Sequence, residues 1–360
     1  MRAVVDVADV APYLAGRGLL SARAMVDGRL RVEDVSRKNR VFLVTADGAP
    51  CSVVKLSADP DDTGVAREAA VLERLGRRLP FLPKRVMYDR ATGVLVLETP
   101  SGARDLAQLP TRGRFSLALA RQAGRALAAL HSLPPDALDG LEQVDPTRIL
   151  AIHRPDLATV RSLSGAALDL VRLVQGSGAL CCRLERLLEP ERRDCVVHGD
   201  VRWDNWLALG RNGSMRRTRV LMLDWELAAA GDPAFDVGAY LAEYLCAWKQ
   251  QAWVPDPLEP GHRLHDPARV LPPLQPAVST FYDAYVRDRA KRRGALNGML
   301  RRAVGFAGAR LVLIALEEAH ACADLQKDVR VTLQLGANVL ERPRWAVDVL
   351  LGLRRYWERA

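Results

Sequence analysis

Two short apolar segments, each followed by a carboxylate, constrain the fold of this chain more than any other feature. Residues 195–197 lead into Asp200, and residues 220–223 lead into Asp224. Short runs rich in β-branched residues predict buried strands. We therefore expect a fold in which two strands each deliver an aspartate to one site.

The residues that follow these strands are the types that phosphoryl transfer requires. One carboxylate orients the attacking hydroxyl and accepts its proton, and a second carboxylate with an amide holds Mg²⁺ against the nucleotide phosphates. Asn205 follows Asp200 with the Asp-x-x-x-x-Asn spacing of the protein-kinase catalytic loop, and Gly199 stands where protein kinases carry arginine. The alternative is that Asp200 and Asp224 only cap turns. The occurrence of both motifs in this order favours the catalytic interpretation.

Lys55 is the one lysine within the strands that we predict, in the apolar segment 52–56. A lysine in such a strand is costly unless it is paired, or unless an edge position lets its ammonium reach water. Glu68 lies near the start of a helix predicted over residues 63–78, and a pair with Lys55 would direct the ammonium toward the α- and β-phosphates. Glu73, further along this helix, is a rival partner.

The character of the chain changes near Pro100. Before it, β-favouring runs enclose a single helix, and after it helical periodicity dominates. We predict an α+β fold of two lobes, with residues 1–99 positioning the nucleotide and residues 100–360 holding the catalytic loop, the metal site and the acceptor site. Residues 254–276 contain seven prolines and predict a long loop. The predicted helices of the second lobe include 115–131, 157–175, 178–188, 234–250, 277–293, 299–322, 328–341 and 344–358.

Composition narrows the class of protein further. Hydrophobic residues make up 49% and charged residues 26%, which excludes a disordered or collagen-like chain. No apolar run approaches the length of a membrane span, and Asp6 and Asp9 stand where a signal peptide would be apolar. The six cysteines show neither C-x-x-C nor histidine partners at metal spacing. We therefore expect a cytoplasmic protein with reduced cysteines and no membrane partner.

Six segments between residues 32 and 244 together carry a family resemblance. They are Val-Val-Lys at 53–55, Arg-Glu-Ala-Ala-Val-Leu at 67–72, His-Gly-Asp at 198–200, Asn205, Leu-Asp-Trp-Glu at 223–226 and Gly-Asp-Pro-Ala-Phe-Asp-Val-Gly at 231–238. These segments resemble the aminoglycoside phosphotransferase and choline-kinase-like family, which has a protein-kinase-like fold of two lobes. The resemblance implies that Asp236 is structural and hydrogen-bonds within the helical lobe.

The resemblance implies an ATP- and Mg²⁺-dependent kinase that phosphorylates a hydroxyl group. Asp200 would be the catalytic base, with Asn205 and Asp224 as catalytic metal ligands. Lys55 and Glu68 would be the nucleotide-binding pair that positions the phosphates. A catalytically silent nucleotide-binding scaffold is the alternative of another class, and the presence of all these residues favours the enzyme.

Two departures from the family affect the nucleotide site. No G-x-G-x-x-G loop is present, and the segment that includes Ser36 and Asn39 lies between the first two predicted strands. These residues would cover the phosphates, or they form an ordinary basic turn. At the junction of the lobes, Glu98 would offer its carbonyl to the base, and because Pro100 has no N–H the donor would shift to Ser101. The choice between ATP and GTP is therefore left open.

The acceptor is predicted from the charge of the helical lobe. Arg202 and Trp203 in the catalytic loop either shape the acceptor side or simply pack. Residues 281–302 carry seven basic and two acidic residues, among them Arg289, Arg292 and Arg293, which form either a solvated helix face or an anion-binding site.

An acidic peptide fits such a basic face, and residues 34–44 resemble kinases that modify ribosomally made precursor peptides. We therefore expect phosphorylation of Ser or Thr in a precursor peptide, as in lanthipeptide (RiPP) biosynthesis. The alternative acceptor is a small-molecule alcohol, such as an antibiotic, a sugar or an amino alcohol. No aromatic-basic platform indicates nucleic acid, and we expect no such partner.

Overall fold

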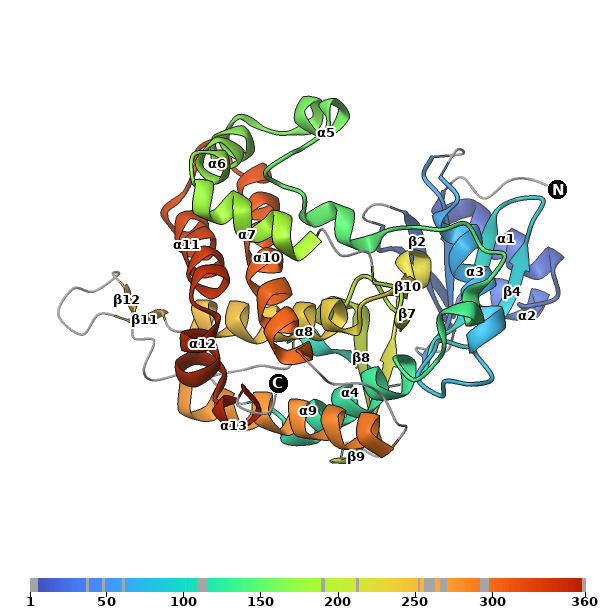
Figure 1. The fold of residues 1–360 in the computed structure, drawn as a ribbon. Helices are drawn as coiled ribbons and strands as arrows, with labels where there is room; N and C mark the ends of the chain where they lie inside the picture. The colour runs from blue at the N-terminus through green and yellow to red at the C-terminus, as the bar shows by residue number, and fades with distance from the viewer. Residues whose placement is uncertain are drawn as a thin grey trace.

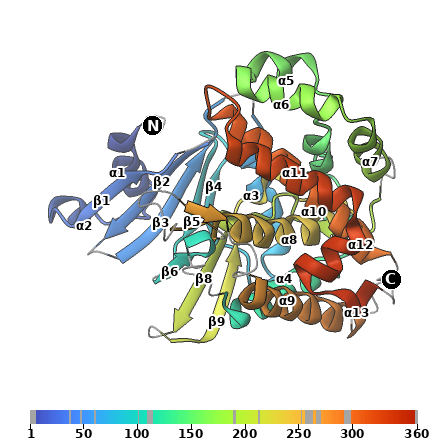
Figure 2. The ribbon, with the colours of Figure 1, turned by 90° about the vertical axis from the view of Figure 1, so that its left-hand side faces the viewer.

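The first lobe is a five-stranded antiparallel sheet with helices on both faces (Figures 1 and 2). The structure is a computed structural model that describes residues 6–36, 39–46, 49–59, 62–100, 102–108, 115–188, 192–211, 214–251, 253–255, 263–265, 271–291 and 298–357. The elements of the first lobe are α1 (Val7–Gly16), α2 (Ala22–Val26), β1 (Leu30–Asp34), β2 (Arg40–Ala46), β3 (Ala49–Leu56), α3 (Gly64–Leu75), β4 (Arg85–Asp89) and β5 (Val94–Glu98). The strand order β1-β2-β3-β5-β4 places β3, which carries Lys55, at the centre of the sheet. Lys55 is therefore not on an edge strand.

The alternation of side chains along β5 shows how the two faces are covered. Val94 and Val96 pack with Tyr13 of α1 on one face, whereas Leu95 packs with Leu72 of α3 on the other. This follows from the period of two along a strand. Since α3 covers one face of the sheet beside β3, its first turns lie within reach of Lys55.

The first helix, α1, is an element that the sequence did not lead us to expect. The Asp6 side chain accepts a hydrogen bond from the backbone N–H of Ala8, and the Asp9 side chain accepts one from the N–H of Asp6, a capping box that starts the helix. The hydroxyl of Tyr13 donates to Asp89 at 2.8 Å, which ties α1 to the end of β4. The spacing of Asp6 and Asp9 is the sequence signal for this helix start.

The second lobe is built mainly from helices, in agreement with the predicted two-lobed α+β fold. At its centre α8 packs against α10, and beside this pair α9 packs against α4 (Figure 2). A side-chain carbon at Gly238 of α8 would lie 2.5 Å from the carbonyl oxygen of Ala303 in α10, so glycine allows this close packing. The longer helices of this lobe are α4 (Leu117–Leu130), α5 (Leu157–Ser162), α6 (Gly165–Gln175), α7 (Gly178–Leu188), α8 (Pro233–Gln251), α9 (Leu271–Lys291), α10 (Met299–His320) and α11 (Lys327–Glu341).

Short strands carry the loops on which the predicted catalytic residues lie. One antiparallel pair is β7 with β10, and a second small sheet has the order β6-β8-β9. Asp200 follows β7 and Asp224 follows β9, as the two apolar segments predicted. The bounds are β6 (Ala103–Asp105), β7 (Cys195–Val197), β8 (Trp206–Arg211), β9 (Ser214–Met222) and β10 (Ala229–Gly231).

The prediction of a loop over residues 254–276 is wrong at its C-terminal end. Helix α9 begins at Leu271, with Pro272 and Pro273 in its first turn, where the missing N–H groups cost no helical hydrogen bond. Earlier in this stretch, β11 (Trp253–Pro255) pairs with β12 (Arg263–His265), and the remaining residues lie outside the described ranges.

Two of the predicted helices are interrupted. The helix predicted over 157–175 is divided into α5 and α6, because Ser164 caps α6 by accepting a hydrogen bond from the N–H of Ala167. The helix predicted over 344–358 consists of α12 (Pro343–Trp345), a π-helix (Ala346–Leu351) and α13 (Arg354–Trp357), with a break at Gly352, where φ is 65°.

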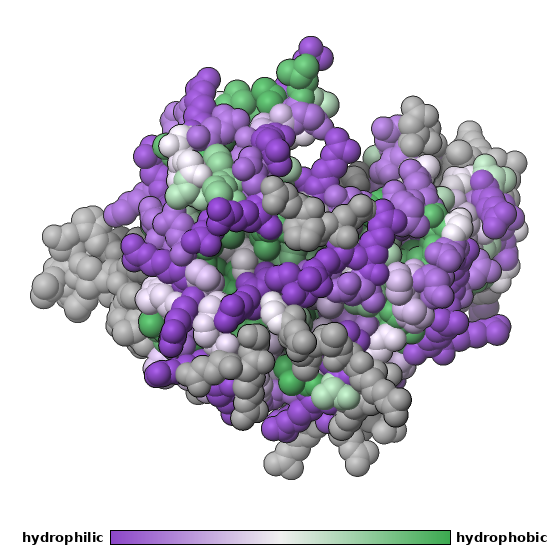
Figure 3. Space-filling view, in the orientation of Figure 1, coloured by the Kyte–Doolittle hydropathy of each residue, from purple (hydrophilic) through white to green (hydrophobic). Residues whose placement is uncertain are grey.

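One face of the molecule is largely polar, and the cysteines are unpaired. Hydrophilic side chains cover most of the face in Figure 3, and hydrophobic ones appear there only in small patches. Within the described part of the chain, no helix is long and apolar enough to span a bilayer. All six cysteines carry free thiols, as predicted.

Candidate active site

A buried carboxylate from α8 fixes the backbone of the catalytic loop. The Asp236 side chain accepts hydrogen bonds from the N–H groups of His198 at 2.7 Å and Gly199 at 3.0 Å, and its Oδ2 lies 3.0 Å from Nε2 of His131. Burial raises the pKa of Asp236, but the hydrogen bond and charge of His131, with the contribution of His198, outweigh it and hold the pKa below its usual value. The structural role that the resemblance implied for Asp236 is confirmed.

Asp200 and Asn205 are joined by direct hydrogen bonds. Nδ2 of Asn205 donates to the Asp200 backbone carbonyl at 3.0 Å and to its Oδ2 at 2.9 Å. Burial raises the pKa of Asp200, and the charge of Asp224 adds to this effect, while Arg310, Arg202 and His198 oppose it. A carboxylate with a raised pKa is a better proton acceptor, which is the property that a general base needs.

Lys55 joins the two lobes at the predicted metal residue. Its ammonium donates to Oε2 of Glu68 at 2.6 Å and also contacts Oδ1 of Asp224. Burial lowers the pKa of Lys55, but the two carboxylates raise it by more, so the ammonium stays charged. The predicted pairing with Glu68 is confirmed, whereas the rival Glu73 lies 3.4 Å from Arg85.

Asp224 is the one described residue other than glycine with a positive φ, at 63°. Aspartate tolerates this left-handed conformation better than most residues, and the turn aims its carboxylate back toward Lys55. Oδ1 of Asn205 and Oδ2 of Asp224 make no hydrogen bond within the described ranges.

These oxygens are the ligand type that Mg²⁺ prefers, so the residues fit this ion. Among the described residues, no group of three histidine, cysteine or acidic side chains forms a closed metal site. An ion held by one amide and one carboxylate would leave positions for phosphate oxygens and water, as Mg²⁺ sites for nucleotides do.

The segment between β1 and β2 is stabilised by its own side chains. The hydroxyl of Ser36 accepts a hydrogen bond from the N–H of Val41 at 2.9 Å, and the N–H of Ser36 donates to Asp34. Asn39 is buried, and its Nδ2 donates to Oε2 of Glu226 at 2.9 Å. Asn39 thus reaches the segment that follows Asp224, a contact that the sequence did not reveal.

Glu98 ends β5 at the junction of the lobes. Its N–H donates to the carbonyl of Lys84 at 2.9 Å, and its carboxylate pairs with the Lys84 ammonium at 2.6 Å on the surface. Ser101, the second residue assigned to base recognition, lies outside the described residues.

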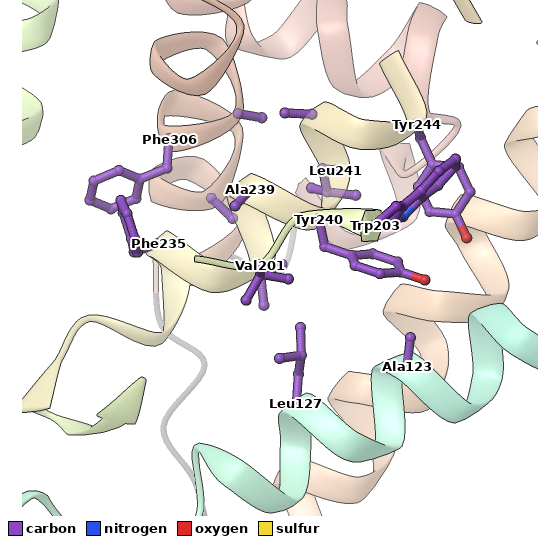
Figure 4. Close-up of a cluster of buried hydrophobic side chains, with 14 of the residues drawn as sticks. Ala123, Leu127, Val201, Trp203, Phe235, Ala239, Tyr240, Leu241, Tyr244 and Phe306 are labelled. Atoms are coloured by element: carbon purple, nitrogen blue, oxygen red, sulfur yellow. The ribbon is translucent and has the colours of Figure 1, made fainter. Parts of the chain in front are cut away.

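Trp203 packs inside the helical lobe, which decides between the two alternatives for this residue. Its side chain is buried, and its ring meets that of Tyr244 edge-on at 5.0 Å and that of Tyr240 at 6.2 Å (Figure 4). The assignment of Trp203 to the acceptor surface is therefore wrong. Its ring is buried among aromatic side chains and stabilises the loop from inside. Arg202 pairs with Asp204: its Nε donates to Oδ1 at 3.1 Å, and its Nη2 donates to Oδ2 at 2.9 Å.

The structure also corrects the acceptor role expected for Arg289. This side chain is buried, and its Nη1 donates to the carbonyl of His131, at the C-terminal end of α4, at 2.6 Å. An arginine at that position satisfies a free helix carbonyl and cannot meet a peptide on the surface. Arg302 is likewise engaged, by Asp232 at 2.6 Å, while Arg292 and Arg293 lie outside the described residues.

Glu243 on α8 is a residue that sequence reasoning missed. Its Oε2 accepts a hydrogen bond from the backbone N–H of Trp203 at 3.2 Å, three residues beyond Asp200. Burial raises the pKa of Glu243 to about 7, although the N–H of Trp203 and the charge of Arg310 lower it. Its position seven residues after Asp236, two turns along one helix face, was the signal that could have found it.

Comparison with known proteins agrees with this site. A model of the phosphotransferase enzyme family matches residues 33–275, and the chain belongs to this family. It is therefore a phosphotransferase that acts on a hydroxyl group.

Solved structures show the same fold at low identity. A choline/ethanolamine kinase family protein from Mesorhizobium loti is 17% identical, with a TM-score of 0.53 over 95% of this chain and 98% of that one. A macrolide 2′-phosphotransferase from Brachybacterium faecium is 20% identical, with a TM-score of 0.50 over 93% of this chain and 98% of that one. A type I macrolide 2′-phosphotransferase is 19% identical, with a TM-score of 0.51 over 93% and 98% of the two chains.

The raised pKa of Glu243 predicts a pH dependence of stability. The folded chain holds the Glu243 proton up to about pH 7, whereas in the unfolded chain it leaves near the usual value of 4.5, so stability falls as the pH rises through this window. Between pH 5 and pH 8, the free energy of unfolding of the wild type should fall by about 1–2 kcal/mol more than that of Glu243→Gln, because the variant has no proton to lose at this position. This figure is reduced because the Glu243 side chain is only partly buried. Urea unfolding at both pH values measures this. Glu341→Gln controls for the loss of an exposed acid, and parallel profiles of wild type and Glu243→Gln would contradict the assignment.

Proposed function

We propose that this protein transfers the γ-phosphoryl group of ATP, as its Mg²⁺ complex, to the hydroxyl of a small alcohol that carries a cationic group. The observation that carries the phosphoryl-transfer part is the contact of Lys55 with both Glu68 and Asp224. It brings a phosphate-binding cation of the first lobe to the metal residue of the second. This is the arrangement that positions nucleotide phosphates in kinases.

Each residue then has a chemical task. Asp200 accepts the proton of the attacking hydroxyl, and Asn205 holds the Asp200 carboxylate in place through Nδ2. Oδ1 of Asn205 and the carboxylate of Asp224 would hold Mg²⁺, which neutralises the charge that develops on the phosphates. Lys55 would hold the α- and β-phosphates, so that the γ-phosphorus stays in line with the attacking hydroxyl and the ADP that leaves.

The remaining assignments to the nucleotide belong to this proposal. Ser36 and Asn39 would cover the phosphates, and Glu98 and Ser101 would meet the base. Residues 1–99 would then form the part that positions the nucleotide, and residues 100–360 would supply the catalytic loop, the metal ligands and the acceptor site.

The charges beside the catalytic loop support a cationic acceptor. Arg202 pairs with Asp204, and Arg310 pairs with Glu317 at 3.1 Å. Glu243 makes no ion pair within the described residues, and its Oε1 accepts no hydrogen bond there. One oxygen of Glu243 is therefore available beside the catalytic loop, where the neighbouring arginines are already paired with other acids. A cationic group bound there would stabilise the ionised carboxyl and lower its raised pKa, which favours an amine or quaternary ammonium group on the substrate.

A Ser or Thr hydroxyl of an acidic precursor peptide, as in lanthipeptide biosynthesis, is the second candidate. It is favoured by the charge of residues 277–360, where 15 basic residues stand against 9 acidic ones, a net of +6. Arg287 and Arg301 are exposed on this part of the chain. Because Arg289 and Arg302 are engaged within the fold, the geometry favours the small alcohol.

Substitutions at the two aspartates should separate chemistry from nucleotide binding. Asp200→Asn should keep Mg²⁺-dependent ATP affinity and lower phosphoryl transfer by about 10²–10⁴-fold, because only the proton acceptor is lost. Asp224→Ala should also remove most of the gain in ATP affinity that Mg²⁺ provides. Calorimetry with ATP, with and without Mg²⁺, and release of labelled phosphate measure the two effects. Asp169→Asn on the exposed face of α6 is the control, and wild-type turnover in Asp200→Asn would remove Asp200 as the base.

An acceptor comparison tests the substrate class. Choline, ethanolamine, glycerol and an acidic serine-containing peptide would be supplied with ATP, and ADP release followed. The cationic alcohols should stimulate turnover, and Glu243→Gln should raise their KM about tenfold while leaving the KM for ATP unchanged. Stimulation by the peptide alone, unaffected by Glu243→Gln, would establish the second candidate instead.

A further inference from the structure

Residues 224–228, which follow β9, each contact another part of the molecule. Asp224 contacts Lys55, the N–H of Trp225 lies 3.4 Å from Oε1 of Glu68, and Glu226 accepts from Asn39. A side-chain carbon at Gly199 would collide with the carbonyl oxygen of Leu227, so the catalytic loop lies directly against that residue. The carbonyl of Ala228 accepts a hydrogen bond from Arg67. We call residues 224–228 the metal segment.

The contact from Arg67 differs from the others, because no step of phosphoryl transfer uses it. Arg67 lies on α3, next to Glu68, and its side chain is buried. Nη2 donates to the carbonyl of Ala228, and Nη1 donates to the carbonyl of Glu142, which lies in the helical lobe. One guanidinium thus bridges two backbone segments of the second lobe from a helix of the first.

This bridge sets where α3 lies relative to the metal segment. Glu68 is the next residue on the same helix, so its carboxylate moves with the backbone that Arg67 holds. The first turn of α3 is attached to the same loop, because the hydroxyl of Thr63 donates to Oε2 of Glu142 at 3.1 Å. A shift of α3 away from Ala228 would therefore draw Glu68 away from Lys55 and Trp225.

We propose that Arg67 is a positioning residue: it fixes α3 against the metal segment and so holds the Glu68–Lys55 pair in place at Asp224. The inference rests on the proposed function, since the pair matters only if it positions nucleotide phosphates. Arg67 acts through Glu68 and touches neither nucleotide nor acceptor.

Lysine is the informative replacement for Arg67. Its single ammonium keeps the charge and much of the stem, but it lacks the planar fork that reaches two carbonyls at once. Arg74 gives a matched control on the same helix. Its Nη1 donates to the carbonyl of Asp139, in the same stretch of the second lobe as Glu142, but the metal segment is not involved.

The test measures ATP affinity with and without Mg²⁺, together with phosphate release, in the full chain. Arg67→Lys should lower Mg²⁺-dependent phosphate release about tenfold and reduce the gain in ATP affinity that Mg²⁺ provides. The affinity for ATP without Mg²⁺ should change less than twofold. Arg74→Lys should match the wild type in all three measurements.

A double-mutant cycle separates positioning from general stability. In the Glu68→Gln background, Arg67→Lys should change phosphate release less than twofold, because its effect passes through Glu68. The proposal would be overturned if Arg67→Lys changed phosphate release by the same factor in both backgrounds. It would also be overturned if Arg67→Lys alone matched the wild type. If Arg67→Lys folds poorly, Arg67→Met, which keeps the buried stem, takes its place in the same cycle.

Hydrogen exchange gives an independent readout. The amides of Trp225 and Ala228 should exchange faster in Arg67→Lys than in Arg74→Lys, and equal rates in the two variants would contradict the role of Arg67. The failure of the proposed function is distinguishable, because the wild-type chain itself would then show neither Mg²⁺-dependent ATP binding nor phosphate release.

Discussion

The site depends on one interaction, the pairing of the buried Lys55 ammonium with the carboxylates of Glu68 and Asp224. A charge at the centre of a sheet is costly unless it is paired, and here one carboxylate comes from each lobe. Because the same ammonium binds a carboxylate of the first lobe and a carboxylate of the second, the two lobes are coupled through this lysine. In the proposed function, this pairing places the cation for the phosphates beside a ligand for Mg²⁺ before any nucleotide arrives, which is the preorganisation that catalysis requires.

The helical lobe applies the same principle to the catalytic loop. Asp236 holds the N–H groups of His198 and Gly199, and Asn205 holds the carboxylate of Asp200. These hydrogen bonds fix the backbone that precedes Asp200 and also its carboxylate, so this side chain has little freedom to turn. Both halves of the site are thus held by buried carboxylates that hydrogen-bond to backbone amides or to the lysine ammonium.

The sequence predicted correctly those contacts that join residues close together in the chain. The pair of Asp200 with Asn205 follows from a local spacing, and the pair of Lys55 with Glu68 follows from one strand and the helix after it. It failed for Arg289, because a count of charges in residues 281–302 cannot say which side of α9 is buried. It missed Glu243 because that contact joins α8 to the catalytic loop, and only tertiary packing brings them together.

A structure with a non-hydrolysable ATP analogue and Mn²⁺ tests the central claim most directly, because anomalous scattering locates the ion without assumption. We expect Mn²⁺ bound to Oδ1 of Asn205 and to the carboxylate of Asp224, with Lys55 on the α- and β-phosphates and the γ-phosphate facing Asp200. An ion that contacts neither Asn205 nor Asp224, or a nucleotide bound away from Lys55, would contradict it.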